Sequence, residues 1–280
     1  MQKLNSSKEI KELSSKWQNS GQKVGFVPTM GNLHKGHLSL IEEAKLQCDL
    51  VVVSIFVNPE QFGPNEDFKE YPRNEASDNQ LCQQAGVDVL WFPTEEQIYP
   101  QGFSTYAKEE DLSRCLCGKS RHDHFRGVCT VLTILFNLIR PHKVFLGQKD
   151  AQQTLIVKKM IKDWHLPLEA VVCPSIRESD GLAMSSRNAN LSREQRAQSA
   201  VIYQSLTAAK ELIREGKTDA SRIAGEINHI LTKKRLLRVI YIEIVSKKTL
   251  KPLKNIETGN TLIALAVWLG SIRLIDNIEV

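Results

Sequence analysis

The stretch Val24-Gly25-Phe26-Val27-Pro28-Thr29-Met30-Gly31-Asn32-Leu33-His34-Lys35-Gly36-His37 is the most informative part of this sequence. It begins with a short apolar run at 24–27, and a helix-like segment at 38–46 follows it. Two histidines separated by two residues, one of them glycine, therefore lie at a strand-to-helix junction. The N–H groups and the dipole at a helix N-terminus favour anions. Gly31 and Gly36 allow backbone to approach a ligand closely, and imidazoles donate hydrogen bonds to phosphate oxygens. The stretch predicts a nucleotide-phosphate site.

Strand-like and helix-like segments alternate on both sides of this stretch. The strand-like segments are 24–27, 50–57, 87–92, 143–146 and 168–173. The helix-like segments are 36–46, 75–85, 150–163 and a fourth at 128–139, which is apolar on nearly every face and is therefore predicted to be buried. Continuous apolar strands separated by helices are typical of a parallel sheet covered on both faces. We predict an α/β fold with a Rossmann-like, doubly wound parallel sheet, and ligands at the carboxyl ends of its strands.

The pattern changes after Pro174. Ser192 has the sequence context of an N-cap, with Gln195 three residues later, and the helix that follows ends at Gly216. A second helix is expected at about 218–232, followed by strand-like segments at 239–245, 262–269 and 272–275. Helices followed by antiparallel strands predict a smaller C-terminal α+β lid domain. We place the Rossmann-like domain at 1–175 and the lid domain at 176–280.

Composition narrows the class of protein. The chain has 280 residues, of which 41% are hydrophobic and 25% charged, so it has enough apolar residues for a full core and is not expected to be disordered. A net charge of +5 suits an anionic substrate but is too small and scattered for nucleic-acid binding. The polar N-terminus does not resemble a signal peptide, and no segment approaches a membrane span. Since the N-terminus does not resemble a signal peptide, the six cysteines are interpreted as free thiols in a reducing cytoplasm. The pair at 115 and 117 has poor spacing for a zinc site.

Three further polar segments follow predicted strands or join the domains. Asn58 and Gln61 follow the second strand, where amides suit a ligand with a carboxylate and a hydroxyl, although Asn-Pro also builds simple turns. Lys149 is a candidate point charge for phosphate, whereas Asp150 suits a first helical turn equally well. In the segment 184–188 (MSSRN), an arginine and two hydroxyls would close over a triphosphate; the alternative is a solvated interdomain loop.

Two other segments are less specific. Tyr71 and Asp78 are interpreted as residues that flank a metal-bound nucleotide, because carboxylate oxygens suit Mg²⁺. His124 and Arg126 precede the predicted buried helix, where they either face an anion or cap the helix. Each of these residues is also compatible with ordinary polar packing.

Taken in order, six segments resemble the motifs of the pantothenate synthetase (pantoate–β-alanine ligase) family, within the HxGH nucleotidyltransferase-like superfamily. They are PTMGNLHKGH, SIFVNPEQFG, YPR, DHFRGV, GQKDAQQ and DGLAMSSRN, and the resemblance extends from about residue 22 to 274–277. It implies an ATP-dependent, AMP-forming ligase that joins (R)-pantoate to β-alanine through pantoyl adenylate, with Mg²⁺, as a cytoplasmic homodimer. The rival hypotheses are an adenylyltransferase that stops after AMP transfer and a silent nucleotide-binding module. A tRNA synthetase would need a longer and more basic chain.

The resemblance also implies roles for individual residues. The catalytic residues would be His34, His37, Lys149 and Arg187, with His37 as the proton donor to the leaving group. Gln61 and Gln153 would bind pantoate, Gln61 would also adjoin β-alanine, and Asp78 would contact the metal. The ATP site would comprise Met30, Gly31, Asn32, Leu33, His34, Lys35, Gly36, His37, Gly147, Gln148, Lys149, Asp150, Ile176, Met184, Ser185, Ser186 and Arg187. Gln148 and Ala151 depart from the family pattern, which has an acidic and an aromatic residue there in many relatives.

Overall fold

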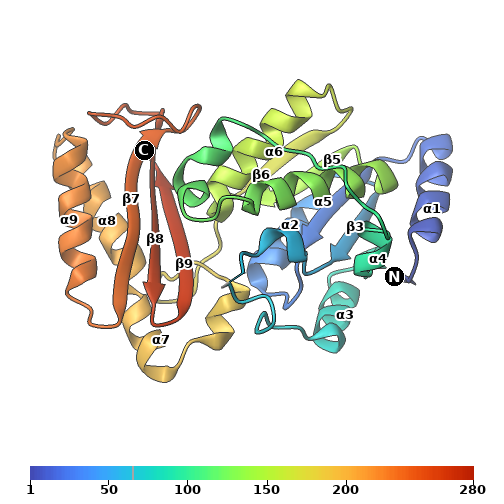
Figure 1. Cartoon of the computed structure of the whole chain (residues 1–280), viewed down its shortest axis with the longest axis horizontal. Helices are drawn as coiled ribbons and strands as arrows, with labels where there is room; N and C mark the ends of the chain where they lie inside the picture. The colour runs from blue at the N-terminus through green and yellow to red at the C-terminus, as the bar shows by residue number, and fades with distance from the viewer. Residues whose placement is uncertain (65) are drawn as a thin grey trace. The chain divides into compact units, whose positions relative to one another are not determined.

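The computed structural model describes residues 1–64 and 66–280, and its internal contacts divide the chain into two units (Figure 1). The first unit comprises Met1–Glu110, Arg121–Gln148 and Gln153–Pro174. The second comprises Asp111–Ser120, Lys149–Gln152 and Ser175–Val280. Two short segments and Ser175, all within the first 175 residues, thus belong to the second unit, so these units differ there from the predicted domains at 1–175 and 176–280.

A six-stranded parallel sheet forms the centre of the first unit. Its strands are β1 (Gln2–Leu4), β2 (Val24–Thr29), β3 (Leu50–Ile55), β4 (Val89–Trp91), β5 (Lys143–Gly147) and β6 (Glu169–Cys173), in the order β1-β4-β3-β2-β5-β6. From β2 the chain continues to β3 and β4 on one side of the sheet, and from β5 it continues to β6 on the other side. The topological switch point therefore lies between these two strands, at whose carboxyl ends such sheets bind ligands.

Helices cover both faces of this sheet. They are α1 (Ser7–Ser20), α2 (Lys35–Gln47), α3 (Glu75–Gln84), the short α4 (Glu95–Ile98), α5 (His124–Ile139) and α6 (Ala151–Asp163). Successive side chains of a strand point to opposite faces. Accordingly Phe26 meets the ring of Phe136 on α5, with ring centroids 6.3 Å apart, whereas Val27 belongs to a buried cluster with Leu40 and Ile41 on α2. The predicted doubly wound parallel sheet is confirmed.

An antiparallel sheet and two packed helices form the core of the second unit. The strands β7 (Leu237–Ser246), β8 (Thr261–Leu269) and β9 (Ile272–Glu279) pair in sequence order. The helices α8 (Val201–Arg214) and α9 (Ala220–Thr232) bury one apolar stripe each, and both stripes pack into one cluster with inward side chains of β8. The predicted α+β character of this part of the chain is confirmed.

The structure differs from the sequence interpretation at two places in particular. The N-terminal strand β1, which pairs in parallel with β4 between Gln2 and Val89, was not predicted. The single helix expected from Ser192 to Gly216 consists of two helices, α7 (Arg193–Ser199) and α8, with Ala200 between them. Its predicted capping box is present, since the N–H of Gln195 bonds the Ser192 hydroxyl. At the interruption the buried Ser199 hydroxyl donates to the carbonyl of Arg196, a local bond that competes with helical pairing.

Candidate active site

The turn after β2 is held against the end of β3 by hydrogen bonds. The Thr29 hydroxyl donates to the carbonyl of Ser54 over 2.9 Å and accepts the N–H of Gly31 over 3.3 Å. Gly31 has φ +85°, and a Cβ there would lie only 3.0 Å from the carboxylate of Asp78 and from Ile55. Both the backbone conformation and the space therefore require glycine.

Asp78 on α3 fixes the next part of this turn. The residue is 2% exposed, and its two side-chain oxygens accept the N–H groups of Asn32 over 2.8 Å and Leu33 over 2.6 Å. Burial raises the pKa of this carboxyl, and the two backbone N–H groups partly oppose that change. Because each oxygen already accepts a backbone N–H in this buried setting, Asp78 has less capacity for Mg²⁺ than a free carboxylate, and its role as a metal ligand stays a prediction. Its observed role is to hold the turn that leads into the two histidines.

His34 and His37 lie together at the start of α2, with ring centroids 4.1 Å apart. Nδ1 of His34 accepts the N–H of Gly36 over 3.1 Å, and Nδ1 of His37 accepts the N–H of His34 over 3.3 Å. A ring nitrogen that accepts a backbone N–H carries no proton, so each neutral imidazole has its proton on Nε2. The local backbone thus sets both histidines as Nε2–H donors at a helix N-terminus.

Gln61 lies at the end of the short helix η1 (Pro59–Gln61) and is held by its main chain. Its carbonyl accepts a hydrogen bond from Arg121 over 3.0 Å and lies 2.8 Å from Nδ1 of His124. Since a carbonyl only accepts, Nδ1 of His124 is the donor. His124 is the first residue of α5 rather than a residue before it, and it supports the Gln61 turn. Arg121 also pairs with Glu66 in the same unit.

Asn58 does not present its amide to a ligand, contrary to one of the two interpretations of its segment. The residue is 1% exposed, and its side chain caps the η1 turn by accepting the N–H of Glu60. The turn-building alternative for the Asn-Pro sequence is therefore the one that the structure supports. Tyr71 is likewise buried, where its ring meets that of Phe62 at a centroid distance of 5.8 Å.

Gln153 lies half-buried in the first turn of α6, and no hydrogen bond within residues 1–64 and 66–280 joins it to Gln61. The adjacent Gln152, which the sequence did not single out, is buried. Its amide accepts the N–H of Cys117 over 2.9 Å and donates to the carbonyls of Leu112 and Cys115. Gln152 therefore organises the segment Asp111–Ser120 within the second unit.

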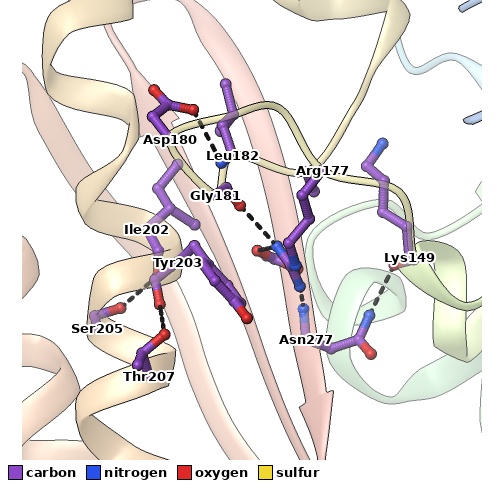
Figure 2. Close-up of polar contacts among 12 residues, drawn as sticks. Lys149, Arg177, Asp180, Gly181, Leu182, Ile202, Tyr203, Ser205, Thr207 and Asn277 are labelled. Atoms are coloured by element: carbon purple, nitrogen blue, oxygen red, sulfur yellow. Dashed lines mark hydrogen bonds and ion pairs between the residues drawn. The ribbon is translucent and has the colours of Figure 1, made fainter. Parts of the chain in front are cut away.

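Lys149 lies in the short helix η4 (Gln148–Asp150), and its backbone is held by the last strand (Figure 2). The Asn277 side chain donates to the carbonyl of Lys149 over 2.9 Å. Next to it, Asp276 accepts two hydrogen bonds from Arg177, over 2.6 and 3.0 Å, and the N–H of Asn277 over 2.8 Å. The Arg177 guanidinium stacks 3.8 Å from the centre of the Tyr203 ring. This network, which the sequence did not predict, orders the backbone around Lys149.

The segment Met184–Arg187 is built into the second unit and is not a loosely solvated loop. The N–H of Met184 bonds the carbonyl of Ile176 over 3.0 Å, and the Ser185 hydroxyl caps the short helix η5 (Ser186–Asn190). Asn188 donates to Glu178 over 2.7 Å and to the carbonyl of Ala183 over 3.1 Å.

The predicted site residues divide between the two units as follows. The first unit contains Met30–His37, Gln61, Asp78, Gly147, Gln148 and Gln153, and the second contains Lys149, Asp150, Ile176 and Met184–Arg187. Contacts in the first unit bring together His34 with His37, and Asp78 with the turn before them. Among the described residues no group of three or more His, Cys, Asp or Glu side chains is arranged to hold a metal ion. In the same part of the chain, no helix has the length and apolar character needed to span a bilayer.

Comparison with known proteins identifies the family. The family model described as pantoate-beta-alanine ligase matches residues 2–279. Pantothenate synthetases of Thermotoga petrophila and Fervidobacterium nodosum are 48% and 50% identical to this chain, over 96% of it and over 96% and 95% of their own lengths.

Solved structures agree with this result. Pantothenate synthetase from Thermus thermophilus superposes with a TM-score of 0.94 at 40% identity, covering 100% of this chain and 99% of that one. A pantoate-beta-alanine ligase from Francisella tularensis, complexed with beta-gamma ATP and beta-alanine, gives a TM-score of 0.80 at 35% identity, with 100% and 97% covered. The sequence, the fold and the paired histidines thus lead to one conclusion: the chain belongs to the pantoate–β-alanine ligase family.

Proposed function

We propose that this chain joins (R)-pantoate to β-alanine in two steps. In the first step, a carboxylate oxygen of pantoate attacks the α-phosphorus of ATP, the bond to the β-phosphate oxygen breaks, and pyrophosphate leaves. In the second step, the β-alanine amine attacks the acyl carbon of pantoyl adenylate, loses a proton, and releases AMP with formation of the amide. A carboxylate is a poor acyl donor until one oxygen becomes part of a phosphate leaving group. The enzyme must therefore position the reactants and stabilise charge.

The observation that carries this proposal is the fixed tautomer of the two histidines. Both Nδ1 atoms accept backbone N–H groups, so both Nε2 atoms are donors in the neutral rings. Donors held in advance of the reaction stabilise the negative charge that develops on phosphate oxygens. We assign His34 and His37 to the triphosphate, with His37 as the proton donor to the departing pyrophosphate. The remainder of Met30–His37 would line the nucleotide.

The carboxylate substrate would be bound by the amides of Gln61 and Gln153. Gln61 is held by its carbonyl to Arg121 and His124, so its position is defined before a ligand arrives. Gln153 is half-buried in the first turn of α6. Gln61 would also adjoin β-alanine.

Lys149 and Arg187 are proposed to stabilise phosphate charge, Lys149 as a point charge and Arg187 through its planar fork of donors. Support for Lys149 comes from its main chain, which Asn277 holds in place. Gly147, Gln148, Asp150, Ile176 and Met184–Ser186 would complete the nucleotide site. Because both oxygens of Asp78 already hold backbone N–H groups, we propose that Mg²⁺ enters as the counter-ion of ATP itself.

The test follows the two products separately. Purified full-length protein is incubated with Mg-ATP and pantoate, with and without β-alanine, and pyrophosphate and AMP are measured. We expect stoichiometric pyrophosphate without β-alanine and sustained AMP release with it. Multiple turnovers of pyrophosphate without an amine would instead indicate an adenylyltransferase. ATP binding with no pantoate-dependent pyrophosphate would refute the proposed substrate.

The family resemblance also supports a homodimer and a cytoplasmic location, which we include in the proposal. Sedimentation equilibrium of the purified protein tests the first, and a mass of one chain at micromolar concentration would contradict it. Fractionation of the native cells tests the second.

A further inference from the structure

A chain of buried contacts in the first unit sets the orientation of the Gln61 amide. Nδ2 of Asn58 lies 3.0 Å from Oε1 of Gln61 and 3.1 Å from the carbonyl oxygen of Gly127. On the other side of the same amide, Oδ1 of Asn58 lies 2.7 Å from the Tyr99 hydroxyl and 3.3 Å from the N–H of Glu60. Asn58 is 1% exposed, so these contacts are made away from water.

The main-chain partners of this amide show which way round it lies. The carbonyl of Gly127 only accepts and the N–H of Glu60 only donates, so Asn58 must place its nitrogen toward Gly127 and its oxygen toward Glu60. Two consequences follow from this orientation. The Tyr99 hydroxyl faces an oxygen that only accepts, and therefore donates to it. Gln61 faces an amide nitrogen, and therefore turns its own oxygen toward Asn58 and its Nε2 away.

The orientation of Gln61 limits what it can bind. An Nε2 amide carries two donors and no acceptor, and Oε1 is already engaged by Asn58. Gln61 is thus prepared to bind an acceptor such as a carboxylate oxygen, which matches the pantoate carboxylate of the proposed function. If the amide of Gln61 turned over, an oxygen would face the carboxylate and the interaction would become repulsive.

Tyr99 is suited to keep this arrangement at every physiological pH. Burial, with Glu60 nearby, raises the pKa of its hydroxyl above the ordinary value, so the hydroxyl stays protonated and donates. Its ring is confined by Phe103 and Phe56, at centroid distances of 5.0 and 6.3 Å. The 2.7 Å bond from Tyr99 is much shorter than the 3.3 Å bond from Glu60, so it is the stronger restraint on Oδ1 of Asn58.

We propose that Tyr99 is a positioning residue for the carboxylate substrate, and that its hydroxyl acts through Asn58 to hold the Gln61 amide nitrogen toward that substrate. The inference rests on the proposed function. Tyr99 does not itself touch the substrate. Its loss should therefore weaken pantoate binding selectively, without a direct effect at the nucleotide.

The primary test replaces Tyr99→Phe, which removes one oxygen and keeps the ring. Tyr106→Phe is the matched control, because the ring of Tyr106 also contacts Phe103. Unlike Tyr99, Tyr106 is 42% exposed and packs against Arg126. Initial rates of pyrophosphate release are measured against pantoate and against ATP. We expect the KM for pantoate to rise about tenfold in Y99F, the scale of one lost buried hydrogen bond, with the KM for ATP within about twofold of wild type. Y106F should match wild type in both.

A double variant separates positioning from general packing. If Tyr99 acts through Gln61, Y99F should add nothing to the pantoate KM of a Gln61→Ala protein. An additive effect, or an equal rise for ATP and pantoate in Y99F, would overturn the inference. Asn58→Asp provides a second variant, because a carboxylate there would attract the Gln61 nitrogen and reverse the amide. A pantoate KM unchanged in N58D would also overturn it. A wild-type protein without pantoate-dependent pyrophosphate release would refute the proposed function instead.

Discussion

The close approach of α5 to the Gln61 turn depends on Gly127 having no side chain. A Cβ at this position would lie 2.1 Å from the carbonyl oxygen and 2.4 Å from the carbonyl carbon of Glu60, and 2.8 Å from the nitrogen of Gln61. All three atoms are backbone, so no side chain can rotate to make room. A separation of about 3.0 Å, the lower limit for such contacts, requires α5 or η1 to move by about 0.9 Å.

The energy of Gly127→Ala follows from this displacement. Overpacking of a close-packed interior costs roughly 1–3 kcal/mol, and loss of the Asn58 bond to the Gly127 carbonyl costs about 1 kcal/mol. Alanine recovers about 1 kcal/mol of helix propensity. The net destabilisation is roughly 1–3 kcal/mol, which lowers Tm by roughly 2–12 °C on the scale of domains of this size. A shift of this size at Gln61 should also reduce pantoate-dependent turnover about 10²-fold.

Gly225→Ala is the matched control for this experiment. Gly225 also lies within a helix, α9, but a Cβ there meets nothing within 4 Å. Both variants gain helix propensity, and only G127A meets backbone. Thermal unfolding by circular dichroism and pyrophosphate release are measured for both proteins. We expect G225A to keep or slightly raise Tm with full activity. If G127A were as stable and active as G225A, the packing argument for the Gln61 turn would be refuted.

Three further outcomes are expected. His37→Ala should lower turnover by about 10²–10³ with an unchanged circular dichroism spectrum, because one donor to the phosphates is lost; a near-normal rate would remove His37 from the mechanism. Asp78→Asn replaces one of the two accepting oxygens by a donor that faces a backbone N–H, so the KM for ATP should rise at least about tenfold. Excess Mg²⁺ should not restore the KM of this variant, and restoration would support a metal role for Asp78. Burial raises the pKa of the thiols of Cys82, Cys129 and Cys173 to about 11 or 12. At pH 9 these thiols should therefore react with iodoacetamide far more slowly in the native protein than in the unfolded protein, which peptide mass spectrometry would measure.

The strands and helices that can be predicted most clearly from the sequence are those in which burial produces a continuous apolar run within the segment itself. The apolar runs of β2 and β3 are continuous because both faces of a parallel sheet are covered, and α5 is apolar nearly all round because it is buried. The strand β1 has one buried side chain, Leu4, in three residues. Its pairing with β4, whose residues lie more than 80 positions away, leaves no periodic pattern in so short a segment.

The site shows the same limit. The paired histidines were predicted because a strand, two glycines and a helix lie in one stretch of sequence. The sequence suggests a metal ligand at Asp78 because a carboxylate near a nucleotide suits Mg²⁺, whereas the partners that the structure gives it are N–H groups 45 and 46 residues earlier. Tyr99 and Asn277 carry no local signal at all, since their contacts with Asn58 and Lys149 exist only after folding. The roles of Gln153 and Arg187 stay predictions.

The hydrogen bond between Asn277 and Lys149 can form only late in protein synthesis, after the strands of the parallel sheet have been made. These residues are 128 positions apart in the sequence. At about 5–20 residues per second, the ribosome needs roughly 6–26 s to reach Asn277 after Lys149 has been added. The six strands of the parallel sheet are all translated by Cys173, so that sheet can form on the nascent chain while the backbone of Lys149 still lacks its last restraint. A message truncated just before codon 276 would therefore yield a chain with its parallel sheet intact and the carbonyl of Lys149 without its donor from Asn277.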